Sequence, residues 1–337
     1  MTPLAAARVN AEEAAVASRA IVATVPAAAG RPAVVYRPAG DSWLLVEYGD
    51  AVLDLRLRFR VHSLERALHT SRTPGVLESA PGVRALLIRY DCLQLSLQHL
   101  VALLRGLEDT LPATEEMVVP SRVVHLPIAC HDRWTRDAVS QYMESVRADA
   151  PYVPDNMEFI ARANGLDSVA QVQEYVLANE HLVIGLGDVY LGAPCAVPLD
   201  PRRRLVVPKY NPARTWTPEG AVGIGGAYLC IYPMESPGGY QLFGRTLPIW
   251  NTTQSTPDFN GRPWLLRTFD RIKFTAVTED ELEALRAAML AGGYRVQIED
   301  GEFVVADYLA FLHEVADEAA AWRAKQSAAV AAATEGY

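Results

Sequence analysis

The stretches "EGAVGIGGAYLCIYP" (219–233) and "ESPGGYQLFGRT" (235–246) lie almost end to end and consist of short apolar runs separated by glycine and proline. The same pattern extends from "HLVIGLGDVYLG" (181–192) to "RIKFTAV" (271–277). Short apolar runs bounded by Gly and Pro turns are typical of the strands of a closed or nearly closed barrel. The pattern therefore predicts a β-barrel in the second half of the chain.

The glycines of this region favour tight corners, because glycine adopts positive φ and lets another chain or a ligand approach closely. "GIGGAY" (223–228) superficially resembles a dinucleotide-binding fingerprint. Its spacing is wrong, however, and it lies between strand-like runs instead of opening a helix. A Rossmann fold is therefore rejected.

The first third of the chain alternates between strand-like apolar runs and the apolar spacing of a helix. "SWLLVEYG" (42–49) and "GVRALLIRYD" (82–91) read as strands. Between them, apolar residues at positions 53, 57, 61, 64 and 68 have the three-to-four spacing of a helix with one buried face. A second helix is predicted over 97–111. Strand, helix, strand and helix in this order predict a small open α/β or α+β sandwich.

The elements around the barrel are predicted to be helical. "RVVHLPIAC" (122–130) reads as a strand and is followed by a helical insertion. Ser168 with Gln171, and Thr278 with Glu281, have the spacing of capping boxes. An amphipathic helix is predicted over 307–333, and it either covers the barrel or docks a partner.

These patterns predict an α+β fold in four parts. An alanine-rich leader over 1–34 is expected to be mobile, because it can bury little. A small α/β subdomain is predicted over 35–120, and the barrel over 121–280 with a helical insertion at 135–180. A helical extension completes the chain over 281–337.

Composition excludes several classes of protein. The 337 residues carry a formal net charge of -9, which argues against a general nucleic-acid surface. The four cysteines form no CxxC pair, so neither a zinc knuckle nor a redox motif is supported. No signal peptide and no uninterrupted apolar run of about 20 residues is found. We expect a soluble, cytoplasmic protein without a bound metal.

The segment "KYNPART" (209–215) places Lys209, Asn211 and Arg214 around a proline. Cations and an amide on a fixed turn suit a carboxylate or a carbamoyl group, although by spacing alone a solvated basic loop is favoured. The acid-base candidates are Asp188, Glu235, Tyr190, Tyr240 and His181. They form no catalytic triad and no metal-ligand spacing. These residues alone therefore name no reaction.

The succession of "GLGDVYLG", "KYNPART" and "GGYQLFGRT" resembles the carboxyltransferase region of urea carboxylase, in the family that includes allophanate hydrolase subunit 1 and the B component of 5-oxoprolinase. The resemblance extends through "WLLVEYGD" and "PWLLRTFDRIKF" and covers about residues 35 to 330. It implies an N-terminal α/β subdomain and a cyclophilin-like β-barrel. Both parts agree with the reading of the residues.

The activity implied by the resemblance is transfer of a carboxyl group from carboxybiotin, held on a separate carrier, to a nitrogen of urea or a urea-like amide. The chain has no ATP-grasp region, no Met-Lys-Met biotinylation site and no second carboxyltransferase half. We therefore expect it to work with that second half, with a biotin carboxylase and with a biotin carrier protein, to be an excised fragment, or to have acquired other chemistry.

The resemblance also suggests roles for individual residues. Lys209 and Arg245 are the candidates for holding the carboxylate. The proton acceptor stays open: Asp188 is one candidate, and biotin itself is the other. The candidates for binding the substrate are Asn211, Arg214, Tyr190, Tyr240, Gly238 and Gly239.

Two of these candidates face a geometric condition. Tyr240 and Arg245 are five residues apart and would point to opposite faces of a regular strand. They share a site only if Gly244 marks a bulge or bend.

Two other functions stay open. The first is a biotin-independent subunit that processes 5-oxoproline, allophanate or another amide. The second is a non-catalytic regulatory binding module. The acceptor, which is urea, guanidine or another amide, and the oligomeric state do not follow from the sequence.

Overall fold

The computed structural model describes residues 20–28, 30–252 and 256–335, and these form two compact units. The first unit contains the described residues up to Val118 together with Val304–Asp307. The second contains Val119–Phe303 and the described residues from Tyr308 onward. Residues 1–19 of the predicted leader lie outside the described residues.

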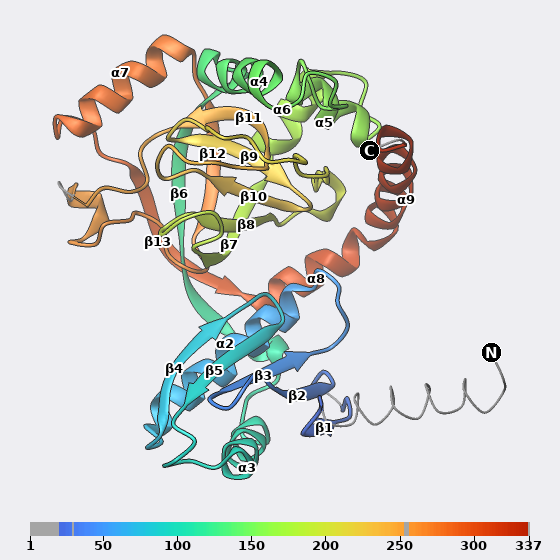
Figure 1. Cartoon of the computed structure of the whole chain (residues 1–337), viewed down its shortest axis with the longest axis vertical. Coiled ribbons are helices and arrows are strands. Elements are labelled where there is room, and N and C mark those ends of the chain that lie inside the picture. The colour runs from blue at the N-terminus through green and yellow to red at the C-terminus, as the bar shows by residue number, and fades with distance from the viewer. Residues whose placement is uncertain (1–19, 29, 253–255, 336–337) are drawn as a thin grey trace. The chain divides into compact units, whose positions relative to one another are not determined.

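The sheet of the first unit has five antiparallel strands in the order β1-β2-β3-β5-β4 (Figure 1). They are β1 (Ala23–Val25), β2 (Val34–Pro38), β3 (Trp43–Tyr48), β4 (Val76–Pro81) and β5 (Ala85–Tyr90). In β3 every second residue is buried, so one face of the sheet forms the core.

Two helices of the first unit share the core of this sheet: α2 (Leu55–Ser71) and α3 (Leu97–Glu108). The side chain of Asp54 caps α2 by accepting a hydrogen bond from the backbone N–H of Arg56. The apolar residues Leu57, Val61, Leu64 and Leu68 are all buried, as their helical spacing predicts. A short 3-10 helix, η1 (Thr114–Glu116), follows α3.

A buried ion pair connects these two helices. The guanidinium of Arg60 contacts the carboxylate of Glu108 at 2.6 Å, and both side chains are only 3% exposed. Tyr48 donates a hydrogen bond to the same carboxylate. Arg60 also donates to the backbone carbonyls of Glu108 and Pro112. The pair therefore satisfies polar groups that the core would otherwise leave without partners.

Seven strands of the second unit close into a barrel (Figure 1). Their order is β11-β9-β10-β8-β7-β12-β6, and pairing of β11 with β6 closes the ring. The strands are β6 (Val118–Cys130), β7 (Glu180–Leu186), β8 (Pro194–Pro198), β9 (Ala221–Gly225), β10 (Tyr228–Ile231), β11 (Gln241–Thr246) and β12 (Arg271–Ala276). The barrel that the glycine-punctuated runs predict is thus confirmed, and β13 (Gln297–Val304) extends it beside β6.

Three helices are inserted between β6 and β7: α4 (Arg133–Ser145), α5 (Asn156–Ala163) and α6 (Val169–Leu177). Ser168 caps α6 by accepting from the N–H of Gln171. The Gln171 side chain accepts from the N–H of Asp167 instead of Ser168. The reciprocal bond of the predicted capping box is therefore displaced by one residue. Thr278 and Glu281 form the complete box at the start of α7 (Glu279–Leu290).

The helix predicted over 307–333 is two helices, α8 (Val305–Glu314) and α9 (Ala316–Ala333). They are separated at Val315, whose φ of -98° and ψ of 13° leave the helical range and whose side chain is buried. Trp322 and Gln326 of α9 donate hydrogen bonds to the backbone carbonyl of Arg204. α9 therefore covers part of the second unit. In the described part of the chain, no helix has the length and apolar character to cross a membrane.

The Arg60–Glu108 pair gives a test of the first unit. We predict that Arg60→Met lowers the free energy of unfolding by about 3–5 kcal/mol, because it leaves Glu108 buried without a cation. The double variant Arg60→Met/Glu108→Leu should be less destabilised than Arg60→Met alone. Guanidinium chloride denaturation measures the free energy of unfolding of the single and double variants. A double variant as unstable as the sum of the two single variants would contradict the pairing.

Candidate functional site

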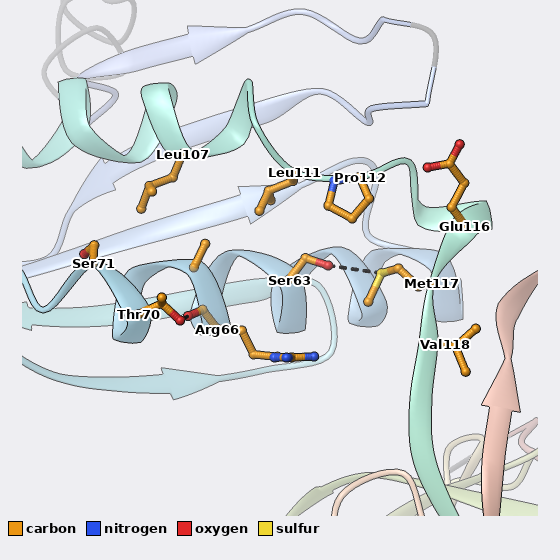
Figure 2. A pocket seen from close by; sticks show the side chains of 11 residues that line it. Ser63, Arg66, Thr70, Ser71, Leu107, Leu111, Pro112, Glu116, Met117 and Val118 are labelled. Carbon is orange, nitrogen blue, oxygen red and sulfur yellow. Dashed lines mark hydrogen bonds between the residues drawn. The ribbon is translucent and has the colours of Figure 1, made fainter.

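A groove of about 590 Å³ lies in the first unit between α2 and α3. Figure 2 shows Ser63, Arg66 and Thr70 on one side and Leu107 and Leu111 on the other. The floor is largely apolar, and none of the residues predicted from the sequence to form the site lines it. The predicted residues lie in the second unit, on the barrel.

Three predicted residues come together there. The hydroxyl of Tyr240 donates a hydrogen bond of 2.5 Å to Oδ2 of Asp188. The Lys209 Nζ lies 4.5 Å from the centroid of the Tyr240 ring, within the range of a cation–π interaction. Asp188 and Lys209 are exposed, whereas Tyr240 is buried. We call this group the Asp188 cluster: an anion and a cation at the surface on either side of a buried phenol.

Different segments bring these side chains together. Asp188 lies in the loop between β7 and β8, and Lys209 in the segment between β8 and β9. Tyr240 directly precedes β11. The antiparallel pairing of β9 with β11 places the Tyr240 ring over β9.

Only glycine leaves room for that ring. A Cβ on Gly225 would lie 2.3 Å from Cδ1 of Tyr240 and 2.9 Å from Cε of Lys209. A Cβ on Gly223 would lie 2.8 Å from Cβ of Tyr240. Carbon atoms in van der Waals contact are about 3.5–4.0 Å apart. Gly223 and Gly225 are therefore needed for the cluster to form.

Electrostatics keep the phenol and the nearby thiols protonated. Burial, and then the hydrogen bond to Asp188, raise the pKa of Tyr240 far above its usual value. Burial, together with the charge of Asp188, raises the pKa of Cys195 to about 12 and that of Cys230 well above its usual value. A thiol nucleophile must be a thiolate, so neither cysteine suits that role.

Arg214 is a buried residue that holds the backbone of Tyr240 in the cluster. It is 1% exposed, and its Nη1 donates to the backbone carbonyl of Tyr240 at 2.6 Å. Its backbone N–H donates to the carbonyl of Gly238, and the N–H of Gly238 donates back. A Cβ on Gly238 would lie 2.2 Å from the Tyr232 hydroxyl oxygen. Arg214 and Gly238 thus hold Tyr240 in place, and their predicted contact with substrate stays a prediction.

The other predicted binding residues flank the cluster. Asn211 is exposed two residues after Lys209. The carbonyl of Gly239 accepts from the N–H of Tyr210 at 2.6 Å and so joins this loop to the start of β11. Tyr190 is 43% exposed, and its ring packs edge-on against Trp250 with centroids 6.3 Å apart.

Arg245 lies in a different set of contacts. Its guanidinium contacts Glu283 of α7 at 2.9 Å, donates to the carbonyl of Glu219, and lies 4.4 Å from the ring of Trp134. Arg286 of α7 also pairs with Glu219. These contacts tie α7 to β11. The predicted carboxylate-binding role of Arg245 stays a prediction, and the structure does not group Arg245 with Lys209.

The strand irregularity near Gly244 that a shared site of Tyr240 and Arg245 would require is present. The pairing of β11 with β9 shifts register between Leu242 and Gly244, which leaves Phe243 as the extra residue. A Cβ on Gly244 would lie 2.6 Å from the carbonyl oxygen of Ala129. The bulge does not bring Tyr240 and Arg245 together, because their contacts lie in the two different groups described above.

The remaining acid-base candidates lie elsewhere. His181 is buried in β7, and burial lowers its pKa to about 4, so it is neutral at pH 7. Its ring packs edge-on against Phe274. Glu235 is exposed. Among the described residues, no three His, Cys, Asp or Glu side chains gather to hold a metal ion.

Sequence reasoning missed the structural partners of the cluster. The glycine pattern predicts tight corners, whereas Gly225, the last residue of β9, lies beneath an aromatic ring. A glycine within a strand signals a close approach of this kind, so the signal was present. Tyr142 and Tyr152, which contact the Lys209 loop from the helical insertion, gave no sequence signal.

Comparisons with known proteins agree with this architecture. Residues 34–259 match the family model "Carboxyltransferase domain, subdomain C and D". The chain is 40% identical over 295 residues to urea amidolyase of Saccharomyces cerevisiae, covering 88% of this chain and 16% of that protein. It is 36% identical over 346 residues to a putative urea carboxylase of Emericella nidulans, covering 98% and 27%.

A solved structure extends the likeness to the fold. The crystal structure of the K. lactis urea amidolyase superposes with a TM-score of 0.82 at 38% identity, over 92% of this chain and 19% of that chain. The 5-oxoprolinase B component of Bacillus subtilis is 26% identical over 260 residues, which is 94% of its own length. The chain thus spans less than a third of the urea-linked relatives it matches. By its sequence and its fold, the chain belongs to the family of carboxyltransferase subdomains C and D.

Proposed function

We propose that this chain is the carboxyltransferase component of a urea carboxylase, and that the Asp188 cluster is its site of transfer. The observation that carries the proposal is the meeting of Lys209, Asp188 and Tyr240 on the barrel of a carboxyltransferase-family chain. The urea-linked names of the more similar relatives support urea as the acceptor.

The cluster suits both reactants. An exposed ammonium group at Lys209 attracts a carboxylate, and the exposed amide of Asn211 can exchange hydrogen bonds with a ureido group. Asp188 accepts N–H groups, which urea and the ureido ring of biotin both present. These residues fit biotin as well as urea. Carboxybiotin, when bound, supplies the activated carboxyl group.

The reaction exchanges one N–C bond for another. With carboxybiotin as the donor, the bond from its ring nitrogen to the carboxyl carbon would break, and a bond would form between a urea nitrogen and that carbon. The urea nitrogen would lose one proton, and the donor nitrogen would gain one. Atoms and charge therefore balance without a further reactant.

The residues of the chain lower the barrier by position and charge. Lys209 holds the carboxylate during the exchange, and Asp188 holds the N–H of urea and carries its proton toward the leaving nitrogen. Tyr240 remains protonated and occupies one oxygen of Asp188, which leaves the other for the substrate. This fixes the carboxylate in one orientation.

The partners belong to the proposal as well. A second carboxyltransferase half, a biotin carboxylase and a biotin carrier would complete the enzyme, because this chain matches only a part of its long relatives.

Substitutions in the Asp188 cluster test its role in the transfer reaction. Lys209→Met, Asp188→Asn and Tyr240→Phe should each lower the rate of allophanate formation by roughly 10²-fold or more, the range of a lost electrostatic or proton-transfer group. The assay uses the chain assembled with its carboxylase components, and circular dichroism checks the fold. Rates near wild type in both Lys209→Met and Asp188→Asn would overturn the assignment.

Arg245 provides the contrast. Because Arg245 pairs with Glu283 and contacts the carbonyl of Glu219, Arg245→Met should lower the free energy of unfolding by about 1–3 kcal/mol. The part of the protein that stays folded should retain transfer activity. A folded Arg245→Met protein without activity would instead restore the carboxylate-binding role predicted from the sequence.

A further prediction concerns the space under the Tyr240 ring. Gly225→Ala should lower both the transfer rate and the melting temperature, because the added methyl overlaps the Tyr240 ring and costs about 1–3 kcal/mol. Gly185→Ala is the matched control, since a Cβ there meets nothing within 4 Å. Thermal unfolding and the transfer assay distinguish the two. Equal behaviour of the variants would show that Tyr240 does not depend on Gly225.

A further inference from the structure

The loop that carries Lys209 and Asn211 is held by two tyrosines of the helical insertion. The Tyr152 hydroxyl accepts a hydrogen bond from the backbone N–H of Asn211 at 2.9 Å and lies 3.2 Å from the carbonyl oxygen of the same residue. The Tyr142 hydroxyl donates to the carbonyl of Pro212 at 3.0 Å. The two hydroxyl oxygens are 2.8 Å apart. The Tyr152 hydroxyl therefore accepts from the N–H of Asn211, and its single proton lies within reach of both the Tyr142 oxygen and the Asn211 carbonyl.

The residue between Lys209 and Asn211 is fixed as firmly. The Tyr210 ring packs against the rings of Tyr152 and Tyr142, at centroid distances of 4.1 Å and 4.7 Å. Its hydroxyl donates to Oδ1 of Asn156, at the start of α5. All three tyrosines are at most 5% exposed. The loop is thus anchored at three successive residues, 210 to 212, while the side chains on either side of Tyr210 reach the surface.

The Tyr142–Tyr152 pair is too well buried to meet a substrate in this structure. The hydrogen bonds described above join its hydroxyls to each other and to the loop backbone. Any effect of these hydroxyls on chemistry would therefore pass through the position of the loop. This separates them from the Asp188 cluster, whose charged groups are exposed.

We propose that Tyr152, with Tyr142, is a positioning residue that fixes Asn211 and Lys209 for binding of the urea-like acceptor. The proposal rests on the function proposed above. A substrate binds more tightly when the binding groups are held in place before it arrives, because less conformational entropy is lost on binding. Loosening the loop should weaken acceptor binding more than it slows the transfer of bound acceptor. It should therefore raise KM for urea more than it lowers kcat.

Three single-hydroxyl variants test this in the chain assembled with its carboxylase components. Tyr152→Phe should raise KM for urea roughly tenfold, since one lost hydrogen bond is worth about one such factor. Tyr142→Phe should have a smaller effect in the same direction. Tyr308→Phe is the matched control, because its hydroxyl donates to the carbonyl of Leu199, away from the loop, and its KM should stay at the wild-type value.

Hydrogen exchange gives a readout that needs no activity. In Tyr152→Phe the amide of Asn211 loses its acceptor, so its exchange with solvent should become at least roughly tenfold faster than in wild type. The exchange of barrel amides should not change. Arg147→Met, which removes a second donor to the Asn211 carbonyl, is the alternative if Tyr152→Phe fails to fold, and it should shift the exchange of this loop in the same direction.

The outcomes separate the two proposals. A wild-type assembly that makes no allophanate refutes the proposed function. The hydrogen-exchange rate of the Asn211 amide in Tyr152→Phe then still tests whether Tyr152 anchors the loop. Wild-type exchange in Tyr152→Phe overturns the anchoring. Faster exchange with an unchanged KM in an active assembly overturns the positioning role, and so does a KM increase of the same size in Tyr308→Phe.

Discussion

The proposed site depends on one steric constraint, which is the lack of side chains at Gly223 and Gly225 of β9. These positions let the Tyr240 ring lie across the strand, with the Lys209 side chain beside it. From that position the Tyr240 hydroxyl reaches Asp188 of a separate loop. Arg214 holds the backbone of Tyr240 from the buried side. A substitution at either glycine would therefore act on residues from three segments at once.

The barrel explains how such distant residues meet. Asp188, Lys209 and Tyr240 lie in segments that leave or enter neighbouring strands, and closure of β11 onto β6 fixes those strands in a ring. The helical insertion then anchors the Lys209 loop through Tyr142 and Tyr152. Charged groups at the surface are thus supported by buried polar groups that are themselves hydrogen-bonded, as a preorganised site requires.

Much of this fold follows from local patterns in the sequence. The barrel strands have short apolar runs, and the capping box at Thr278 fixes the start of α7. The strands β4 and β13 escaped prediction because both are exposed on most of their length, so their sequences, "VLESAP" and "QIEDGEFV", carry no alternating apolar pattern. The interruption at Val315, whose side chain is buried, is marked by no glycine or proline in the sequence.

The candidate site is harder to read from the sequence. The motifs "GLGDVYLG", "KYNPART" and "GGYQLFGRT" supplied Asp188, Lys209 and Tyr240, but they also supplied Arg245, whose charge is used by Glu283 and Glu219. Ion pairing across elements that are far apart in the chain cannot be inferred from spacing. The same limit applies to Tyr142 and Tyr152, whose hydroxyls contact loop residues that are 70 and 59 positions away in the chain.

A single turnover with a labelled carboxyl group tests the transfer itself. Carrier protein bearing isotopically labelled carboxybiotin is mixed with urea and the assembled carboxyltransferase, and the fate of the label is measured by mass spectrometry. If the chain performs the transfer, the label appears on a urea nitrogen, and only when this chain is present. Label released solely as bicarbonate, at the same rate with and without the chain, would contradict that role.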